Sequence, residues 1–429
     1  MDRCRIFPKG PLVGRTRVVG SKSLTIRALE ASALARGSSV IAQPADCDDV
    51  DVFVRALRDL GITIDPGDEL SIEGSSGQLS PKAEVIDLGP AGTPFRFAMG
   101  LAALGNGPIT LDGTERMRER PVGPLTDALR ALGARVDYLG IDGYPPVRVS
   151  ASGNLGDAVT IHAGESSQYL SALLLIGPVL PRGLRIELSG SLASAPYVEL
   201  TLEVMRAFGA ESSRDAGSFY VPPTGYRGAR YVVPGDASSA AYFFAAAAIT
   251  GGDVTVLGLG DLSAQGDFGL LEVLETMGCR VERGTGEVRV IGPDRLHGLD
   301  VDLNAMPDQV PTVAVLAAVA EGTTRIRNVA HLRLKESDRL EAVATGLRAA
   351  GIEATVLEDG LRIKGGHPER AEIDTRDDHR MVMAFSVLSL HSEPMTIWQP
   401  GCVSKSFRRF FDCLEGLGVE IESLPGGVS

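Results

Sequence analysis

The sequence predicts an α/β fold made of six copies of one small helix–strand unit, three copies in each of two domains. The main observation is a phrase that occurs six times: a bulky apolar residue, two spacers, a second and mostly bulky residue, then glycine. The copies lie roughly seventy residues apart, a period too long for a solenoid repeat. Their glycines are Gly61, Gly133, Gly209, Gly278, Gly351 and Gly418.

Each of these glycines predicts the end of a half-exposed helix. In the first copy Leu57 and Leu60 precede Gly61, and glycine readily adopts the left-handed conformation that closes a helix. The β-branched residues that follow, as at 62–64 and 419–421, predict a strand.

A second recurring signal is a helix-length stretch that is apolar on nearly all sides. A helix without a polar face is buried on all sides in a globular protein. We therefore expect each unit to contain one buried helix, one half-exposed helix and several strands. The six stretches cover residues 27–35, 95–104, 169–180, 240–249, 312–320 and 381–390.

Length and composition narrow the class of protein. A chain of 429 residues exceeds one ordinary core, which favours two domains of three units each. No apolar run has the length of a membrane span, and the N-terminus lacks the apolar segment of a signal peptide. The five scattered cysteines show no metal-ligand spacing and are typical of reduced thiols. We expect a cytoplasmic protein with no membrane partner.

Charge points to small anions as ligands. A net charge of −13 argues against nucleic acid as a partner. Local basic clusters in an acidic chain favour a small anionic ligand, although each cluster could also be a solvated helix end. They comprise Arg116, Arg118 and Arg120; Arg333, Lys335 and Arg339; Arg376 and Arg380; and Lys405, Arg408 and Arg409.

Polar residues gather where the buried helices are expected to start. N-capping accounts for one Ser, Thr or Asp oxygen per helix. It does not account for Lys22, Arg27 and Arg380, because the positive end of a helix disfavours a cation. A cation there needs an anion, and free helix N–H groups bind phosphate. The segments are residues 20–23 (Gly-Ser-Lys-Ser), 91–93 (Ala-Gly-Thr), 166–168 (Ser-Ser-Gln), 236–239 (Asp-Ala-Ser-Ser), 307–308 (Pro-Asp) and 378–380 (Asp-His-Arg).

A second set of polar residues precedes the half-exposed helices, at 120–121, 194–197, 335–339 and 405–406. We expect Lys335 and Arg339 to share one helix face, with Glu336 one position round. An intrahelical salt-bridge network would explain this cluster equally well. If equivalent units stack around a common centre, both sets converge on one cleft.

No single motif is specific. Residues 20–23 lack the glycine spacing of a nucleotide-binding P-loop. Asp308 could be a plain N-cap, His379 a core histidine, and Gln168 and Tyr197 ordinary packing residues. The ordered set across six units is specific.

That ordered set resembles the 5-enolpyruvylshikimate-3-phosphate synthase family over nearly the whole chain, from about Lys9 to Phe411. Lys-Glu-Ser-Asp-Arg at 335–339 and Asp-His-Arg-Met at 378–381 separate this family from the related UDP-N-acetylglucosamine enolpyruvyl transferases. The other matching motifs are residues 20–23, 91–93 with Arg96, 119–121, 166–168 and 235–239.

The resemblance implies a two-domain inside-out α/β barrel, with buried helices and outer sheets. Residues 1–20 and 234–429 would form domain I, with the phosphoenolpyruvate-side residues. Residues 21–233 would form domain II, with the shikimate-3-phosphate-side residues and the active site in the interdomain cleft. The two chain crossings, near Gly20 and Pro234-Gly235, would be hinges.

The resemblance also implies the reaction. A family member transfers the enolpyruvyl group of phosphoenolpyruvate to the 5-hydroxyl of shikimate-3-phosphate and releases phosphate through a tetrahedral intermediate. This is a step of the shikimate pathway to chorismate and the aromatic amino acids. The expected enzyme is a monomer and needs no cofactor or metal.

Site residues carry over by matching motif. Asp308 and Glu336 would be the acid–base pair: Glu336 donates a proton to C3, Asp308 takes the hydroxyl proton, and Lys22 shares either role. The shikimate-3-phosphate site would comprise Lys22, Ser23, Arg27, Ser166, Ser167, Gln168, Ser194, Tyr197, Asp308, His331 and Lys335. The phosphoenolpyruvate site would comprise Lys22, Gly92, Arg120, Gln168, Arg339, Arg380 and Lys405.

Two positions depart from the family pattern. Pro90 and His331 each stand where the family usually has Asn. Proline has no N–H and no side-chain donor, so a polar contact near phosphoenolpyruvate is lost and sensitivity to mimics of that substrate is in question.

Three other functions compete with this one. A reactive Cys in a mobile loop would favour an enzyme that uses a UDP-sugar. Residues 117–120, in the corresponding region, contain no Cys. An RNA 3′-phosphate cyclase would be expected to have a basic surface. A non-catalytic phosphate-binding protein gains nothing from carboxylates at Asp308 and Glu336.

Overall fold

The chain folds into two compact units, as seen in a computed structural model that describes residues 2–425 except 152, 154, 216, 262–264 and 392. Unit 1 comprises Met1–Val19 and Pro234–Ser429, and unit 2 comprises Gly20–Val233. Residues 426–429, at the end of the expected domain I, lie outside the described part. Gly20 groups with unit 2 rather than with domain I, since its Cα lies directly against the backbone of Gln43 and Pro44.

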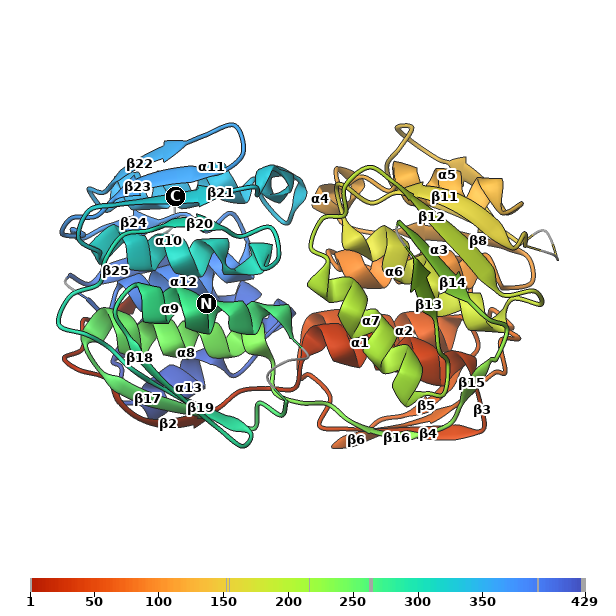
Figure 1. Cartoon of the computed structure of the whole chain (residues 1–429), viewed down its shortest axis with the longest axis horizontal. Helices are drawn as coiled ribbons and strands as arrows, with labels where there is room; N and C mark the ends of the chain where they lie inside the picture. Colours follow the sequence, from red (N-terminus) through yellow and green to blue (C-terminus); the bar gives the residue numbers. More distant parts are fainter. Residues whose placement is uncertain are drawn as a thin grey trace. The chain divides into compact units, whose positions relative to one another are not determined.

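In the described part of the chain, each unit contains three four-stranded sheets, and all six share one pattern of strand pairing. Figure 1 shows strands of these sheets around the helices of each unit. A parallel pair at one edge is followed by two antiparallel pairings, as in β7 (Val85–Asp87), β8 (Pro108–Asp112), β10 (Val147–Ser150) and β9 (Arg135–Tyr138). Unit 2 also has a two-stranded sheet, β3 (Ala35–Arg36) with β15 (Tyr226–Arg227). The repeated pattern confirms the repeated αβ unit.

The other five four-stranded sheets have these strand orders. In unit 2 they are β11 (Ala158–His162), β12 (Leu184–Ser189), β14 (Ser218–Val221), β13 (Ser213–Asp215); and β16 (Arg230–Val232), β4 (Ser38–Ala42), β6 (Glu69–Glu73), β5 (Thr63–Asp65). In unit 1 they are β2 (Val13–Arg17), β17 (Asp253–Leu257), β19 (Glu287–Ile291), β18 (Arg280–Gly284); β20 (Asp300–Asp302), β21 (Thr323–Arg327), β23 (Leu361–Lys364), β22 (Glu353–Val356); and β24 (Glu372–Ile373), β25 (Met395–Trp398), β1 (Arg3–Ile6), β26 (Ile421–Leu424).

Strands near the two chain crossings pair with distant parts of the sequence. Strand β1 pairs with β25 and β26 of unit 1. Strand β2 precedes the first helix of unit 2, yet it pairs in parallel with β17 of unit 1. Strand β16 precedes the first helix of the C-terminal half, yet it pairs in parallel with β4 of unit 2. These pairings explain why the first 19 residues belong to the unit formed by the C-terminal half of the chain.

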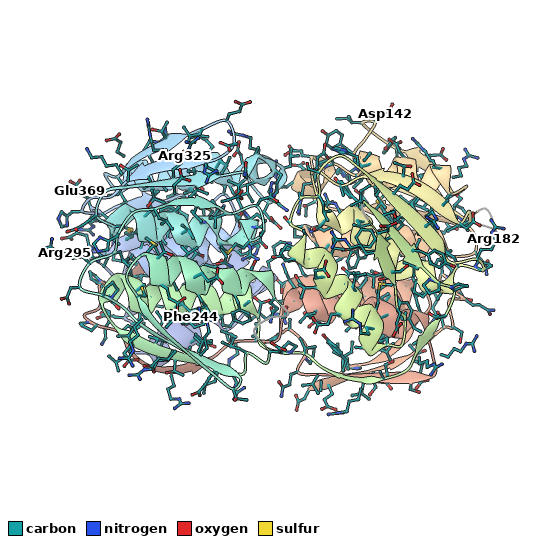
Figure 2. All side chains as sticks on the ribbon, viewed as in Figure 1. Asp142, Arg182, Phe244, Arg295, Arg325 and Glu369 are labelled. Carbon is teal, nitrogen blue, oxygen red and sulfur yellow. The ribbon has the colours of Figure 1, made fainter. Side chains whose placement is uncertain are left out.

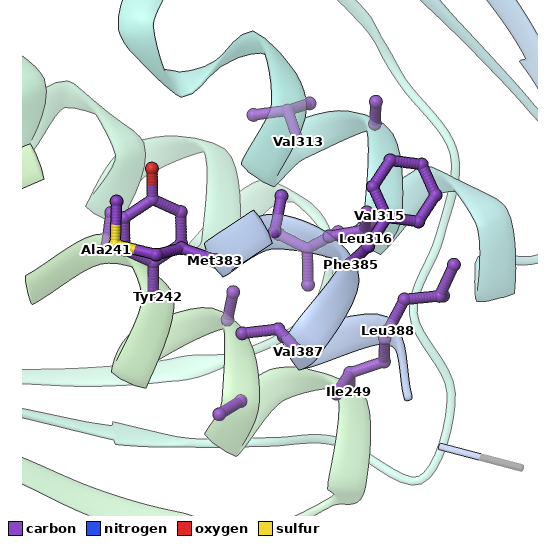
Figure 3. Packing of buried hydrophobic residues seen from close by; sticks show 14 of the residues in the cluster. Ala241, Tyr242, Ile249, Val313, Val315, Leu316, Met383, Phe385, Val387 and Leu388 are labelled. Atoms are coloured by element: carbon purple, nitrogen blue, oxygen red, sulfur yellow. The ribbon is translucent and has the colours of Figure 1, made fainter. Parts of the chain in front are cut away.

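Six helices are buried on almost every side, as their sequences predicted. They are α1 (Lys22–Leu34), α3 (Gly92–Ala102) and α6 (Ser167–Ile176) in unit 2, and α8 (Ala237–Thr250), α10 (Val310–Val319) and α12 (His379–Leu388) in unit 1. Within each unit the three helices pack against one another and the sheets lie outside them. Figure 3 shows this packing in unit 1, where Tyr242, Leu316 and Phe385 come from three different helices. The inside-out α/β arrangement is confirmed.

The half-exposed helices end at the predicted glycines. All six glycines have positive φ, between 77° and 110°. In the first copy Gly61 N–H donates to Arg58 O and Ile62 N–H donates to Leu57 O, both at 3.0 Å. The same two bonds close all six helices. These helices are α2 (Asp48–Asp59), α5 (Gly123–Ala131), α7 (Pro196–Ala207), α9 (Leu270–Thr276), α11 (Arg339–Ala349) and α13 (Phe410–Gly416).

Most charged side chains are exposed on the surface of each unit. Among the residues that Figure 2 labels, Asp142, Arg182, Arg295, Arg325 and Glu369 are exposed, whereas Phe244 is buried. In the part of the chain that the structure describes, no helix combines the length and the apolar character needed to cross a membrane.

One helix glycine is required by packing. Gly346 lies inside α11, and a Cβ there would overlap the ring of the buried Phe385. Gly346→Ala should therefore lower the free energy of unfolding by roughly 1–3 kcal/mol, as overpacked cores do. The matched control is Gly416→Ala in α13, where a Cβ meets no atom within 4 Å. It should stabilise by up to about 1 kcal/mol through helix propensity alone. Denaturant unfolding measures both, and equal stabilisation by the two would contradict this account.

A buried carboxyl group in α1 makes stability depend on pH. Glu30 is fully buried, and neither carboxyl oxygen has a hydrogen-bond partner among the described residues. Burial raises its pKa well above the ordinary value, although the charge of Arg27 opposes the shift. The folded protein holds this proton more tightly than the unfolded chain does. The free energy of unfolding is therefore greatest below the unfolded pKa of 4.5, and it decreases as the pH rises towards the pKa of the folded state.

Glu30→Leu should remove that loss. We expect the variant to gain roughly 1–3 kcal/mol of unfolding free energy near pH 8, and less at pH 5. Glu211→Leu, at an exposed position, is the control and should show a small gain or loss that does not vary with pH. Urea melts at several pH values measure both variants. A gain at Glu30 that is the same at pH 5 and pH 8 would rule out an ionisable group as its cause.

Candidate active site

The polar segments predicted at helix starts do lie at the starts of the six buried helices. Side-chain oxygens of Ser166, Asp236 and Asp378 cap three of these helices by accepting a backbone N–H. Asp308 is not an N-cap: it lies in the single turn η3 (Pro307–Gln309), and α10 starts after it with Gln309 as the N-cap. Its carboxylate is therefore available for other contacts.

Unit 1 contains a cluster of two arginines and three carboxylates, which we name the carboxylate–arginine cluster. The buried Arg339 binds all three carboxylates: Nη1 donates to Asp308 at 2.9 Å, Nη2 to Glu336 at 2.8 Å and Nε to Asp378 at 2.8 Å. Arg380 Nη2 donates to Asp308 at 2.6 Å. Asp308 thus receives charge-assisted hydrogen bonds from two arginines.

The charges of this cluster keep Asp308 ionised. Burial alone would raise its pKa, but Arg380, Arg339 and Lys335 outweigh burial and hold the pKa well below the usual range. Arg380 also donates to the hydroxyl of the buried Tyr242, at 3.4 Å. Asp308 is therefore ionised near neutral pH and paired with two arginines.

The prediction that Lys335 and Arg339 share one helix face is wrong. Helix α11 begins only at Arg339, with Asp338 as its N-cap, and Lys335 is extended. The side chain of Asp338 accepts the Glu341 N–H at 3.2 Å, a contact that favours a helix start over a helix interior. Glu336 reaches Arg339 from the preceding segment rather than along one helix.

Two further predicted residues, His331 and Lys405, lie in unit 1. His331 is in the turn η4 (Ala330–Leu334), and among the described residues its buried Nε2 has no hydrogen-bond partner. Burial first, and the charge of Lys335 second, lower the pKa of His331 to about 4, so its ring is neutral at pH 7. Lys405 is buried at the end of η5 (Pro400–Lys405).

In unit 2 the predicted residue Arg27 is buried and held by acceptors of its own unit. Nε donates to Thr201 Oγ1 at 2.8 Å, Nη1 to Ser23 O at 2.9 Å and Nη2 to Tyr197 O at 3.1 Å. Arg27 therefore joins the start of α1 to the start of α7. Ser194 lies just before α7 with a φ of 54°, in the left-handed region.

A carboxylate of the protein accompanies Lys22. Lys22 Nζ lies 2.8 Å from Oδ2 of Asp49, which is buried in the first turn of α2. The sequence analysis missed Asp49, since an acidic residue at a helix start is normally explained by the helix dipole. The cation at the start of α1 therefore has an anion partner within its own unit.

Arg96 connects three segments of unit 2. Its guanidinium donates to Gly92 O at 3.0 Å, to Gln168 Oε1 at 3.1 Å and to Pro121 O at 2.9 Å. Gln168 Nε2 in turn donates to Thr93 Oγ1 at 2.9 Å. Because Arg96 lies within the otherwise apolar helix α3, the local sequence pattern predicts no role for it.

Arg120 lies against the start of α3. It is buried, and Nη1 donates to Pro90 O at 3.3 Å. A Cβ at Gly92 would lie 2.5 Å from Nη2 of Arg120, so only glycine allows this approach. Pro90 lacks a side-chain donor, but its carbonyl helps to place the guanidinium. The nearby Ser166 and Ser167 are both buried.

The predicted residues thus divide between the two units. Unit 1 carries Asp308, His331, Lys335, Glu336, Arg339, Arg380 and Lys405, and unit 2 carries Lys22, Ser23, Arg27, Gly92, Arg120, Ser166, Ser167, Gln168, Ser194 and Tyr197. In the described ranges, no three His, Cys, Asp or Glu side chains are grouped so that they could hold a metal ion.

The chain is similar to curated proteins along nearly its whole length. A protein of Syntrophobacter fumaroxidans is 44% identical over 421 residues, which cover 97% of this chain and 99% of the relative. A protein of Shewanella amazonensis is 40% identical over 425 residues, which cover 96% and 98%. Both are named 3-phosphoshikimate 1-carboxyvinyltransferase.

Solved structures show the same fold. EPSP synthase from Acinetobacter baumannii superposes with a TM-score of 0.82 at 28% identity, covering 99% of this chain and all of the other. The enolpyruvyl transferase NikO from Streptomyces tendae superposes with a TM-score of 0.77 at 20% identity, covering 99% of each chain, and shows the fold alone.

The family model that matches residues 6–414 is described as EPSP synthase (3-phosphoshikimate 1-carboxyvinyltransferase). Together with relatives at 40% identity and above over nearly the whole chain, this match shows that the chain belongs to the EPSP synthase family.

Proposed function

We propose that this chain transfers the enolpyruvyl group of phosphoenolpyruvate to the 5-hydroxyl of shikimate-3-phosphate and releases phosphate. The observation that carries the proposal is the carboxylate–arginine cluster. There Asp308 and Glu336, the two carboxylates with proposed proton-transfer roles, share the guanidinium of Arg339. Family membership supplies the substrate pair.

The reaction proceeds by addition and elimination. The 5-hydroxyl oxygen adds to C2 of phosphoenolpyruvate, the hydroxyl proton goes to a base, and C3 receives a proton from an acid. The tetrahedral adduct then loses inorganic phosphate and a proton from the new methyl group. Both substrates are anions, so their mutual repulsion must be overcome before they can react.

Cations of both units oppose that repulsion. We assign phosphoenolpyruvate to Lys22, Arg120, Arg339, Arg380 and Lys405, with Gly92 and Gln168 beside them. Charge-assisted hydrogen bonds contribute roughly 1.5–3 kcal/mol each. The 3.4 Å contact of Arg380 with Tyr242 is long, and a bond to the substrate anion would replace it with a stronger one.

Shikimate-3-phosphate binds mainly to hydroxyl and amide groups. Arg27 supports this site by fixing Ser23 and Tyr197 through their carbonyls. A neutral His331 can donate to or accept from a substrate hydroxyl, so it can take the place of the usual Asn. The full proposed set is Lys22, Ser23, Arg27, Ser166, Ser167, Gln168, Ser194, Tyr197, Asp308, His331 and Lys335.

Proton transfer falls to the two carboxylates. The ionised Asp308 suits the base that takes the 5-hydroxyl proton. Glu336 would donate to C3 once bound substrates exclude water, and Lys22 would share either transfer. Holding two anions side by side supplies much of the remaining rate.

The residues belong to two units, so we propose that the substrates engage both at once. Residues 1–20 and 234–429 act as the phosphoenolpyruvate-side domain, and residues 21–233 act as the shikimate-3-phosphate-side domain. The crossings near Gly20 and Pro234-Gly235 act as hinges. We further propose a cytoplasmic monomer without cofactor, metal, nucleic-acid or membrane partner, in keeping with the five free cysteines.

Phosphate release tests the function directly. The purified chain is supplied with phosphoenolpyruvate and either shikimate-3-phosphate or UDP-N-acetylglucosamine. Phosphate release with shikimate-3-phosphate but not with UDP-N-acetylglucosamine supports the proposal. Release only with the UDP-sugar would identify a different acceptor, and release with neither would end the proposal.

Arg120→Ala should weaken phosphoenolpyruvate binding far more than shikimate-3-phosphate binding. Loss of one buried charged contact predicts a rise in KM for phosphoenolpyruvate of roughly ten- to hundredfold. Steady-state kinetics with each substrate varied measures this. The control is Arg118→Ala, two residues before Arg120, which removes an exposed arginine paired with Asp112. Equal loss of both affinities in Arg120→Ala would remove Arg120 from its role.

Glu336→Gln should leave shikimate-3-phosphate affinity nearly intact and lower kcat by roughly two orders of magnitude or more, the contribution of a general acid. Glutamine keeps an oxygen acceptor for Arg339. Calorimetric titration and turnover measurements separate the two effects. Glu341→Gln, which alters an exposed glutamate paired with Arg348, is the control. Near-normal turnover of Glu336→Gln would show that another residue protonates C3.

A further inference from the structure

Another buried carboxylate near Asp308, besides Asp378, has no place in the mechanism above. Asp267, in the turn η2 (Gly266–Gly269), is buried. Its Oδ2 accepts a short hydrogen bond from Ser238 Oγ and another from Gln309 Nε2 at 3.0 Å. Its Oδ1 is buried and, among the described residues, has no hydrogen-bond partner. A carboxylate in this position has a desolvation cost that needs an explanation.

The bond to Gln309 connects Asp267 with Asp308. Gln309 directly follows Asp308 in the three-residue turn η3, and it is fully buried. Among the described residues, the Oε1 atom of Gln309 has no hydrogen-bond partner. Its Nε2 atom donates to Asp267. In so short a turn, a hydrogen bond that holds Gln309 also restrains the direction of the neighbouring Asp308 side chain.

The other contacts of this segment tie Asp267 to a rigid element. Gln265 Oε1 accepts the Ala237 N–H at 3.0 Å, and its Nε2 donates to Gly235 O at 2.7 Å. Ser238, which binds Asp267, lies in the first turn of α8. Residues 265–267 therefore join the start of a buried helix to the turn that carries Asp308.

We propose that Asp267 is a positioning residue for Asp308: through Gln309 it holds the turn, and its negative charge makes Asp308 a stronger base. A like charge nearby raises the proton affinity of a carboxylate, which offsets part of the effect of Arg339 and Arg380. This inference rests on the proposed function, because Asp308 is there the group that takes the 5-hydroxyl proton.

The inference predicts a pH dependence. The groups that face Asp267 are Asp308 and Gln309 from η3, Arg380 from α12, and Ser238 from α8, whose N-cap is Asp236. Burial first, and the charge of Asp308 second, raise the pKa of Asp267 to about 6. Asp267 therefore loses its charge as pH falls through about 6, and kcat should fall over the same range.

Asp267→Asn tests the role of the charge at nearly constant size. We expect kcat at pH 7.5 to fall roughly tenfold, KM for both substrates to stay within about twofold, and the inflection of kcat near pH 6 to disappear. Asp253→Asn makes the same change at a carboxylate paired with Arg289 on a sheet, and it should keep the wild-type profile.

Gln309→Leu tests the route of the effect. It removes the link to the turn but leaves the charge of Asp267, and kcat should again fall. If Asp267 acts partly through Gln309, the double variant should lose less than the product of the two single losses. Thermal unfolding of every variant shows whether each remains folded.

Three results would overturn the inference: wild-type kcat and pH profile in Asp267→Asn, equal changes in kcat and both KM values, or fully multiplicative losses in the double variant. A wild-type chain that releases no phosphate from the two substrates would instead overturn the proposed function, and this inference with it. An active wild type with an unaltered Asp267→Asn variant would overturn this inference alone.

Discussion

The structure depends on the burial of helices that have no polar face. Each unit encloses three such helices within three sheets, so their sides can present little besides apolar groups to one another. Functional polar side chains can then gather at a helix end, where N–H groups lack partners and the dipole is positive. The repeated fold therefore determines where a site for anions can form before any catalytic residue is chosen.

This location creates an electrostatic problem that the protein solves with its own carboxylates. Lys22 is accompanied by Asp49, and Arg339 and Arg380 are accompanied by Asp308. Buried cations without such partners would be costly. In the proposed function, a substrate anion would enter a site whose charges are already positioned and would exchange long or shared contacts for direct ones. One of these carboxylates, Asp308, is also a group to which we assign proton transfer.

The sequence predicted elements better than it predicted contacts. The six glycines, the six buried helices and the polar helix starts all follow from local pattern, since each depends on residues within a few positions. The prediction of one helix face for Lys335 and Arg339 was wrong, because Asp338 caps the helix and the helix begins only at Arg339. Asp49 and Asp267 were missed, because an acidic residue near a helix start or in a turn has an ordinary local explanation.

The sequence by itself determined the repeat, the class of fold and the type of residue at each helix start, because hydrophobic period and turn chemistry act over short distances. Only the tertiary structure decided which strand completes which sheet and which carboxylate meets which arginine. The pairings of β2 with β17 and of Arg339 with Asp378 join residues far apart along the chain. Such contacts depend on how separate elements pack, and no local pattern encodes that.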